Sequence, residues 1–214
     1  MLIDEDLFQK SMEFYDEFFS NKEEQKGFII RILQLNNIKP RCMLNMVRRH
    51  VNLSDEIMEL HQESDILGLF NLVVAIEAVY TLADSKLFKI DMLIDFFKNY
   101  TTKSDQDIIK KKFRLSLGDD ITLIRKEEIS LDEFARVIYA LRCDYVHEGN
   151  YWNSSFNSIS DTYLINILKV KLPEISKEAE ERAFETILTL RDIRRIIVMG
   201  LIRLIRKYTA SIAE

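Results

Sequence analysis

Residues that interrupt helices are scarce in this sequence. Its 214 residues include only five glycines and two prolines, far fewer than the roughly 12% of positions that these two residues together occupy in average proteins. Because both residues disfavour helix interiors, their scarcity over so long a chain favours a helical protein. The length suits one sizeable domain with its own hydrophobic core.

Cysteine is also scarce, and the two that are present, Cys42 and Cys143, form no CxxC pair. The sequence therefore indicates neither a disulfide framework nor a zinc site. No apolar run approaches 18 residues, and the first six residues are acidic where a signal peptide would be basic. We expect a cytoplasmic protein with no membrane partner.

Motifs for metals and nucleotides are missing as well. The sequence has no Gly-rich phosphate loop, no HExxH pair and no nucleophile elbow. His50 and His61 are too far apart on a continuous helix, about 16 Å, to share a metal. We expect no metal and no cofactor. The formal net charge of −5 carries no global sign of nucleic-acid binding, so only a local basic face would serve that purpose.

Helical periodicity is present along almost the whole chain, which predicts an all-α fold: a single helical bundle over residues 1–214. We expect N-terminal helices in residues 1–62, a bundle core in residues 65–209, and a loop or short hairpin after the helix that ends near residue 148. Ser54, Ser104, Ser130 and Ser176 are predicted to cap helices. The predicted helices are 5–19, 23–36, 41–50, 55–62, 65–84, 87–100, 131–148 and 177–209.

The most informative segment lies where the helix 131–148 ends. Arg142 and His147 stand five residues apart there, and His147 is one of only three histidines in the chain. A fixed cation beside a titratable imidazole is suited to catalysing the cleavage of a phosphodiester. In an ideal helix, however, the two positions lie about 140° apart. They converge only if the last turn unwinds towards Gly149 or if a second subunit supplies one of them.

A structural interpretation of the same residues is also open. The helix dipole favours a histidine in the last turn, and Asp144 can pair with it from three residues earlier. Arg142 lies at the edge of the apolar stripe of its helix, where an unpaired charge is costly. It would then bridge to a carboxylate on a neighbouring helix. That interpretation predicts an internal salt bridge for Arg142 and a solvent-facing His147.

The phrase Leu-Arg-Cys-Asp-Tyr-Val-His-Glu-Gly, residues 141–149, resembles the HEPN superfamily (higher eukaryotes and prokaryotes nucleotide-binding). The hallmark of that family is an arginine, four to six mostly apolar residues, and a histidine at the end of a bundle helix. The apolar segment 74–80, which contains Glu77, looks like the upstream family helix. One position departs from the pattern, because active members commonly have Asn, Asp or His where this chain has Cys143.

The resemblance implies a metal-independent endoribonuclease, often dimeric, of the kind found in toxin–antitoxin and phage-defence systems. RNA, a second copy of the chain and an antitoxin or regulatory protein are the partners that it implies. His147 would act as base or acid, Arg142 would stabilise charge on the phosphate, and Asp144 would orient the imidazole. The alternative is a HEPN-like module without catalysis that binds RNA, a nucleotide or a protein.

Further candidates would contact the substrate. Glu77 is either a buried partner of Arg142 or a partly exposed residue at a helix edge. Tyr151 and Trp152 would stack on unpaired bases, or anchor their loop to the bundle. Arg195 and Arg206 belong to a basic stripe on the last helix that would follow a phosphate backbone, or simply face solvent.

Overall fold

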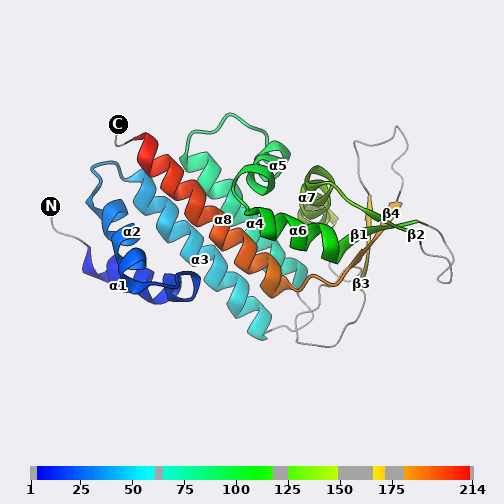
Figure 1. Ribbon diagram of the computed structural model, residues 1–214, viewed down its shortest axis with the longest axis horizontal. Helices are drawn as coiled ribbons and strands as arrows, with labels where there is room; N and C mark the ends of the chain where they lie inside the picture. The colour runs from blue at the N-terminus through cyan, green and yellow to red at the C-terminus, as the bar shows by residue number, and fades with distance from the viewer. Residues whose placement is uncertain (1–3, 61–64, 118–124, 149–165, 172–180, 213–214) are drawn as a thin grey trace.

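The computed structural model describes residues 4–60, 65–117, 125–148, 166–171 and 181–212 (Figure 1). Within these ranges, the side chains of residues 116–117, 125–127, 144–148, 166–171 and 181–183 lie outside the described part. The helices are α1 (Glu5–Tyr15), α2 (Lys22–Gln34), α3 (Lys39–Leu60), α4 (Asp65–Leu82), α5 (Lys89–Asn99), α6 (Lys103–Lys112), α7 (Leu131–Glu148) and α8 (Leu190–Ser211), with a short 3-10 turn, η1 (Asp16–Phe18). The strands are β1 (Phe113–Leu117), β2 (Arg125–Glu128), β3 (Asn166–Lys171) and β4 (Glu181–Thr186).

Helix α4 forms the centre of the bundle. It contacts α3, α5, α7 and α8, and α3, α4 and α8 run side by side, oblique to the long axis of the molecule (Figure 1). Its side chains are apolar on nearly every face, and Leu69, Leu72 and Ile76 are completely buried. A helix that is apolar all round needs neighbours on all sides. Among the described residues, α4 alone has the length and hydropathy of a membrane span, and 67% of that segment is buried inside the bundle.

The ring of Phe96, on α5, closely approaches the backbone of α8. At Gly200, an added Cβ atom would lie 2.5 Å from Cζ of Phe96. Only glycine fits at such a close approach.

The helices α1 to α8 confirm the mainly helical character that the sequence predicts.

A four-stranded antiparallel sheet lies at one end of the bundle, with strand order β2-β1-β4-β3 (Figure 1). Phe113 of β1 and Phe184 of β4 are buried, and both belong to the hydrophobic core. The Phe113 ring meets that of Phe134 of α7 edge-on. Strand β3 lies where the sequence allowed a strand before Pro173, but its antiparallel partner β4 follows Pro173, in a segment predicted as helix. The β1–β2 pair was not predicted.

Three local predictions were wrong. Residues 41–60 belong to one helix and not to two, because α3 is continuous to Leu60 and the Ser54 hydroxyl donates to the Gly68 carbonyl instead of capping. Thr102, not Ser104, caps α6 in a reciprocal capping box with Asp105. The last helix begins at Leu190, capped by Thr189, because residues 181–186 pair with β1 as a strand. Tertiary pairing here outweighs the helix propensity of the local sequence.

Candidate functional site

Helix α7 carries the two residues of the predicted motif. Ser130 caps it as predicted: the Ser130 hydroxyl accepts from the Glu133 amide at 3.2 Å, and the Glu133 carboxylate accepts from the Ser130 amide at 2.8 Å. Phe134, Ile138 and Leu141 bury the inner face of the helix. This packing fixes the rotation of α7 and directs the Arg142 side chain toward α4.

Arg142 pairs with Glu77 of α4. Nε of Arg142 lies 3.3 Å from Oε1 of Glu77, and Nη2 donates to Oε2 at 3.4 Å. Both side chains are only 11% exposed. The guanidinium also stands over the ring of Phe70, 5.8 Å from its centroid. The buried Arg142 therefore pairs with the carboxylate of Glu77, as the structural interpretation of the motif predicts.

The contacts between these two groups are long for a charge-assisted pair. Among the described residues, neither Nε of Arg142 nor Oε1 of Glu77 has a partner with hydrogen-bond geometry. Lys89, at the start of α5, places its Nζ 3.3 Å from Oε2 of Glu77, and its side chain is 53% exposed. We call Glu77, Lys89 and Arg142 the Glu77 cluster. It has two cations and one carboxylate, so it is formally positive.

Tyr139 and Cys143 of α7 border the Glu77 cluster. Burial raises the pKa of the Tyr139 hydroxyl, the hydrogen bond with Cys143 raises it further, and the charge of Arg142 opposes the rise. Cys143, the residue that departs from the family pattern, is thus one cause of the raised pKa of Tyr139, which the charge of Glu77 also raises and the charge of Arg142 lowers. The sequence did not point to Lys89 or Tyr139, because no motif links them to α4.

Position 147 lies on the same continuous helix as position 142, since α7 runs to Glu148 without interruption. Helix geometry therefore keeps these two positions about 140° apart. The last turn does not unwind before Glu148, which removes one of the two routes to convergence. The side chains of Asp144 and His147 lie outside the described residues, as do Tyr151 and Trp152 altogether.

The two arginines predicted on α8 have different neighbours. Arg206 donates to Glu24 of α2 at 2.7 Å and stands over the rings of Phe19 and Phe28. Arg195 instead donates to Asp105 of α6 at 2.8 Å. The structure therefore does not bring Arg195 and Arg206 together into one site, and among the described residues their ion pairs are with Asp105 and Glu24 and not with the Glu77 cluster.

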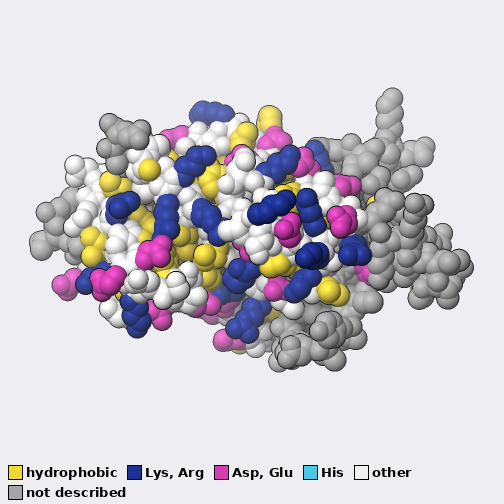
Figure 2. Space-filling view, in the orientation of Figure 1, with side chains coloured by type: hydrophobic (Ala, Val, Ile, Leu, Met, Phe, Trp, Pro, Cys, Tyr) yellow, Lys and Arg dark blue, Asp and Glu magenta, His cyan; other side chains and the backbone are white. Residues whose placement is uncertain are grey.

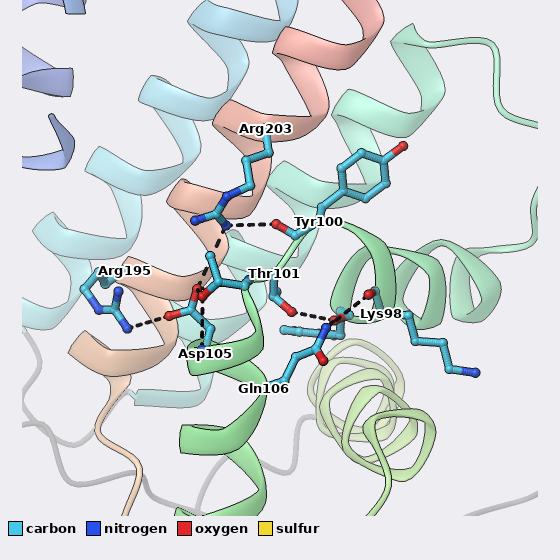
Figure 3. Close-up of polar contacts among 9 residues, drawn as sticks. Lys98, Tyr100, Thr101, Asp105, Gln106, Arg195 and Arg203 are labelled. Atoms are coloured by element: carbon cyan, nitrogen blue, oxygen red, sulfur yellow. Dashed lines mark hydrogen bonds and ion pairs between the residues drawn. The ribbon is translucent and has the colours of Figure 1, made fainter. Parts of the chain in front are cut away.

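Asp105 is the centre of a second charged cluster (Figure 3). Its side chain is 4% exposed, and Nη1 of Arg203 lies 3.9 Å from Oδ2 while donating to the Tyr100 carbonyl at 2.9 Å. Burial opposes ionisation of Asp105, but hydrogen bonds from Thr102 and Arg195 outweigh it and hold the pKa of the carboxyl below its ordinary value. We call Asp105, Arg195 and Arg203 the Asp105 cluster.

Two surface hollows flank α8. One, of about 380 Å³, is lined by residues of α2 and α8 that include Glu24 and Arg206. The other, of about 350 Å³, is lined by residues that include Asp55 and Arg194. Neither is lined by Arg142 or Glu77, so these hollows are separate from the Glu77 cluster. Within the described ranges, no three His, Cys, Asp or Glu side chains are grouped so that they could hold a metal ion.

The chain matches no family model, and no curated protein or solved structure is similar enough to match it.

Proposed function

We propose that this chain is a metal-independent endoribonuclease of HEPN type, and that two copies together form its active site. The observation that carries the proposal is the geometry of α7. This continuous helix holds Arg142 in a formally positive cluster. Position 147 lies five residues further along the same helix and about 140° around its axis from position 142. Because the helix does not unwind, a second α7 is needed to bring an arginine and a histidine to one phosphate.

The Glu77 cluster gives Arg142 a way to bind phosphate. Its contacts with Glu77 are long, and Lys89 contacts the same carboxylate. Lys89 can therefore keep Glu77 neutralised while Arg142 donates to phosphate oxygens. Arginine suits this exchange because its planar fork matches phosphate as well as carboxylate.

The chemistry needs no metal. The 2′-hydroxyl oxygen attacks phosphorus, its proton passes to a base, and the bond from phosphorus to the 5′-oxygen breaks as that oxygen takes a proton. The products are a 2′,3′-cyclic phosphate and a 5′-hydroxyl. His147 supplies proton transfer near neutral pH, Asp144 orients it, and Arg142 stabilises the charge that grows on the phosphate.

The biological setting in this proposal is a cytoplasmic toxin–antitoxin, phage-defence or stress system. A metal-independent RNase needs no cofactor that a cell could withhold. Control of its activity would therefore fall to a partner protein, such as an antitoxin that covers the α7 surface or prevents pairing of two copies.

A mixing experiment tests the shared site. We expect wild type to cleave RNA in the presence of a chelator, and His147→Ala to lose about 10²- to 10⁴-fold. Arg142→Ala and Arg142→Lys should also be impaired, while Lys26→Ala on exposed α2 should retain activity. A mixture of Arg142→Ala and His147→Ala in equal amounts should recover about a quarter of wild-type activity, because each mixed dimer has one intact site. An inactive mixture, or equal activity in every variant, contradicts the proposal.

A second candidate is a HEPN-like module that binds RNA, a nucleotide or a protein without cleavage. The observation in its favour is that Arg142 is as buried as Glu77, which suits a structural ion pair. Replacing the pair together, by Glu77→Leu with Arg142→Met, separates the candidates. A binding module should keep its ligand affinity after this change, whereas the RNase should lose activity.

A further inference from the structure

Positive charge is concentrated on two neighbouring helices. Helix α8 contains six Lys or Arg residues and one Asp, and α6 contains four Lys and two Asp. Their formal charges are thus +5 and +2 in a chain with a net charge of −5. Lys and Arg side chains gather over α6 and α8 on the face shown in Figure 2. The rest of the chain is therefore strongly acidic, and the cationic region is local.

Helices α6 and α8 run antiparallel and are joined by ion pairs between their side chains. Lys112 at the end of α6 pairs with Asp192 at the start of α8 at 2.8 Å. Near the other end of α6, Asp105 accepts from Arg195. The Asp105 cluster therefore lies between the two helices, where Asp105 orients the side chains of Arg195 and Arg203.

We call Arg191, Arg195, Arg203 and Lys207 of α8 the basic tract. Met199 occupies the remaining position of this four-residue spacing, so the row follows the inclined i±4 ridge of the helix. It extends over about 24 Å along the helix axis and turns by about 160° around it, so a strand that follows the row winds partly around α8. Arg191, Arg195 and Lys207 are exposed, and Arg203 is partly so.

The arginines of the Asp105 cluster have donors to spare. A guanidinium has five N–H donors. Within the described residues, Arg195 uses Nη2 for Asp105, and Arg203 uses Nη1 for Asp105 and the Tyr100 carbonyl. Burial lowers the pKa of Arg203, and the nearby Arg195 and Arg206 lower it further, against the opposing effect of Asp105. An added anion would relieve this repulsion between cations.

We propose that the basic tract binds the sugar–phosphate backbone of single-stranded RNA. A single inclined row of cations suits one strand, whereas duplex RNA is recognised across two successive grooves. Tyr100, partly exposed, lies beside the tract with the Lys207 ammonium 5.3 Å from its ring centre, and single-strand sites commonly combine basic grooves with aromatic side chains. The choice of RNA as the polyanion rests on the proposed function.

The test measures binding without cleavage. A fluorescent 2′-O-methyl oligouridine of about 16 nucleotides lacks the attacking hydroxyl, so its anisotropy reports affinity even for a protein that cleaves nothing. Arg191→Gln with Lys207→Gln removes two exposed charges that form no ion pair with any residue that the structure describes. Lys22→Gln with Lys26→Gln on α2 is the matched control, with the same change in net charge.

We expect wild type and the α2 control to bind alike, and the tract variant to bind about 10-fold more weakly at low salt. The slope of log affinity against log salt should become shallower by about 1.4, since each phosphate contact on a single strand contributes about 0.7. Adding Arg195→Gln should weaken binding further. Equal binding by the tract variant and the control overturns the proposal, as does absence of binding by wild type.

Two other ligands are tested in parallel. Tighter binding of the same oligomer after annealing to its complement overturns the single-strand assignment. Sedimentation with phosphatidylserine vesicles, but no binding of the oligomer, overturns RNA as the ligand. Failure of cleavage alone, with oligomer binding intact, contradicts the proposed catalysis and leaves the basic tract supported.

Discussion

The Glu77 and Asp105 clusters each place two cations around one carboxylate, yet they differ in how the carboxylate is satisfied. Asp105 accepts from the Thr102 amide and hydroxyl at 3.2 and 2.6 Å and from Arg195 at 2.8 Å. Glu77 has contacts of 3.3 and 3.4 Å with Arg142, and its Oε1 accepts no hydrogen bond within the described residues. One carboxylate is firmly held, and the other is held loosely.

The positions of the cations differ as well. In the Asp105 cluster the carboxylate is buried, while the side chain of Arg195 is 48% exposed. The N–H groups of Arg195 that have no partner among the described residues can therefore donate to an external anion directly. In the Glu77 cluster the arginine is as buried as the carboxylate. Arg142 must leave part of its contact with Glu77 to reach a ligand. Under the two proposals, α8 would bind an anion without rearrangement, whereas the α7 site would need rearrangement or a second copy.

The largest expected effect comes from breaking the buried pair at one end. Glu77→Gln leaves Arg142 without a charged partner, and we expect a loss of roughly 3–5 kcal/mol in the free energy of unfolding, measured in urea. Glu77→Leu combined with Arg142→Met should recover most of that loss, because no buried charge is left unpaired. A cost of less than about 1 kcal/mol for Glu77→Gln would mean that Glu77 does not hold Arg142.

Asp105→Ala should cost less, about 1–3 kcal/mol, since Arg195 and Arg203 are open enough to water to be solvated when their carboxylate is removed. The same urea titrations measure this effect. Asp107→Ala is the matched control on α6, because its carboxylate is more exposed and contacts only Lys103 at 3.7 Å among the described residues. Equal effects of the two substitutions would contradict the central role of Asp105.

The pH dependence of Asp105 sharpens the comparison. Its folded-state pKa lies below the ordinary value, so its ionised form stabilises the fold fully above the unfolded pKa of about 3.9. That contribution is lost as pH falls through the lower folded pKa. The stability difference between wild type and Asp105→Asn should therefore be constant near neutrality and shrink in acid. A difference that grows on acidification would contradict this assignment.

Thr102→Ala removes the hydroxyl that caps α6 and that donates to the Asp105 carboxylate, while the backbone amide of residue 102 still donates to it. We expect a cost of about 1 kcal/mol by thermal or urea unfolding. Ser104→Ala is a sharp control. Both residues stand three positions before an aspartate, but only Thr102 caps the helix. A larger effect at Ser104 than at Thr102 would contradict the observed start of α6.

Lys89→Gln should have the smallest effect on stability, below about 1 kcal/mol, because an exposed lysine contributes little to an ion pair. Its effect should instead be seen in RNA cleavage, if Lys89 neutralises Glu77 while Arg142 binds phosphate. Lys86→Gln, an exposed lysine just before α5, is the control for both measurements. Identical cleavage by the two variants would remove Lys89 from the site.

The helices could be predicted from the sequence because their apolar residues recur with helical spacing and their caps are local. The boundaries that failed depended on distant partners. Residues 181–186 read as helix, but the pairing of Phe184 with Leu115 of β1 makes them a strand. No local pattern carries that information, because the two strands lie far apart in the chain.

The candidate site shows the same division. Arg142 and His147 were found through their motif, and Glu77 was correctly considered as a buried partner. Lys89 and Tyr139 were missed, because their contact with this site depends on how α5 and α7 pack on α4. Asp105 was not singled out, because Asp107 was the acid of the capping box expected from Ser104, and the ion pair of Asp105 with Arg195 joins residues 90 positions apart.

The pairing of β1 with β4 has a consequence for the order of folding. Strand β1 follows α6 directly, β4 leads into α8, and the amide of Ile187 donates to the Lys112 carbonyl at 2.9 Å. Helices form quickly from local contacts, whereas this strand pairing must first close the long intervening chain into a loop. We therefore expect α6 and α8 to be aligned late in folding. A fragment containing either helix alone would carry the positive charges without their arrangement.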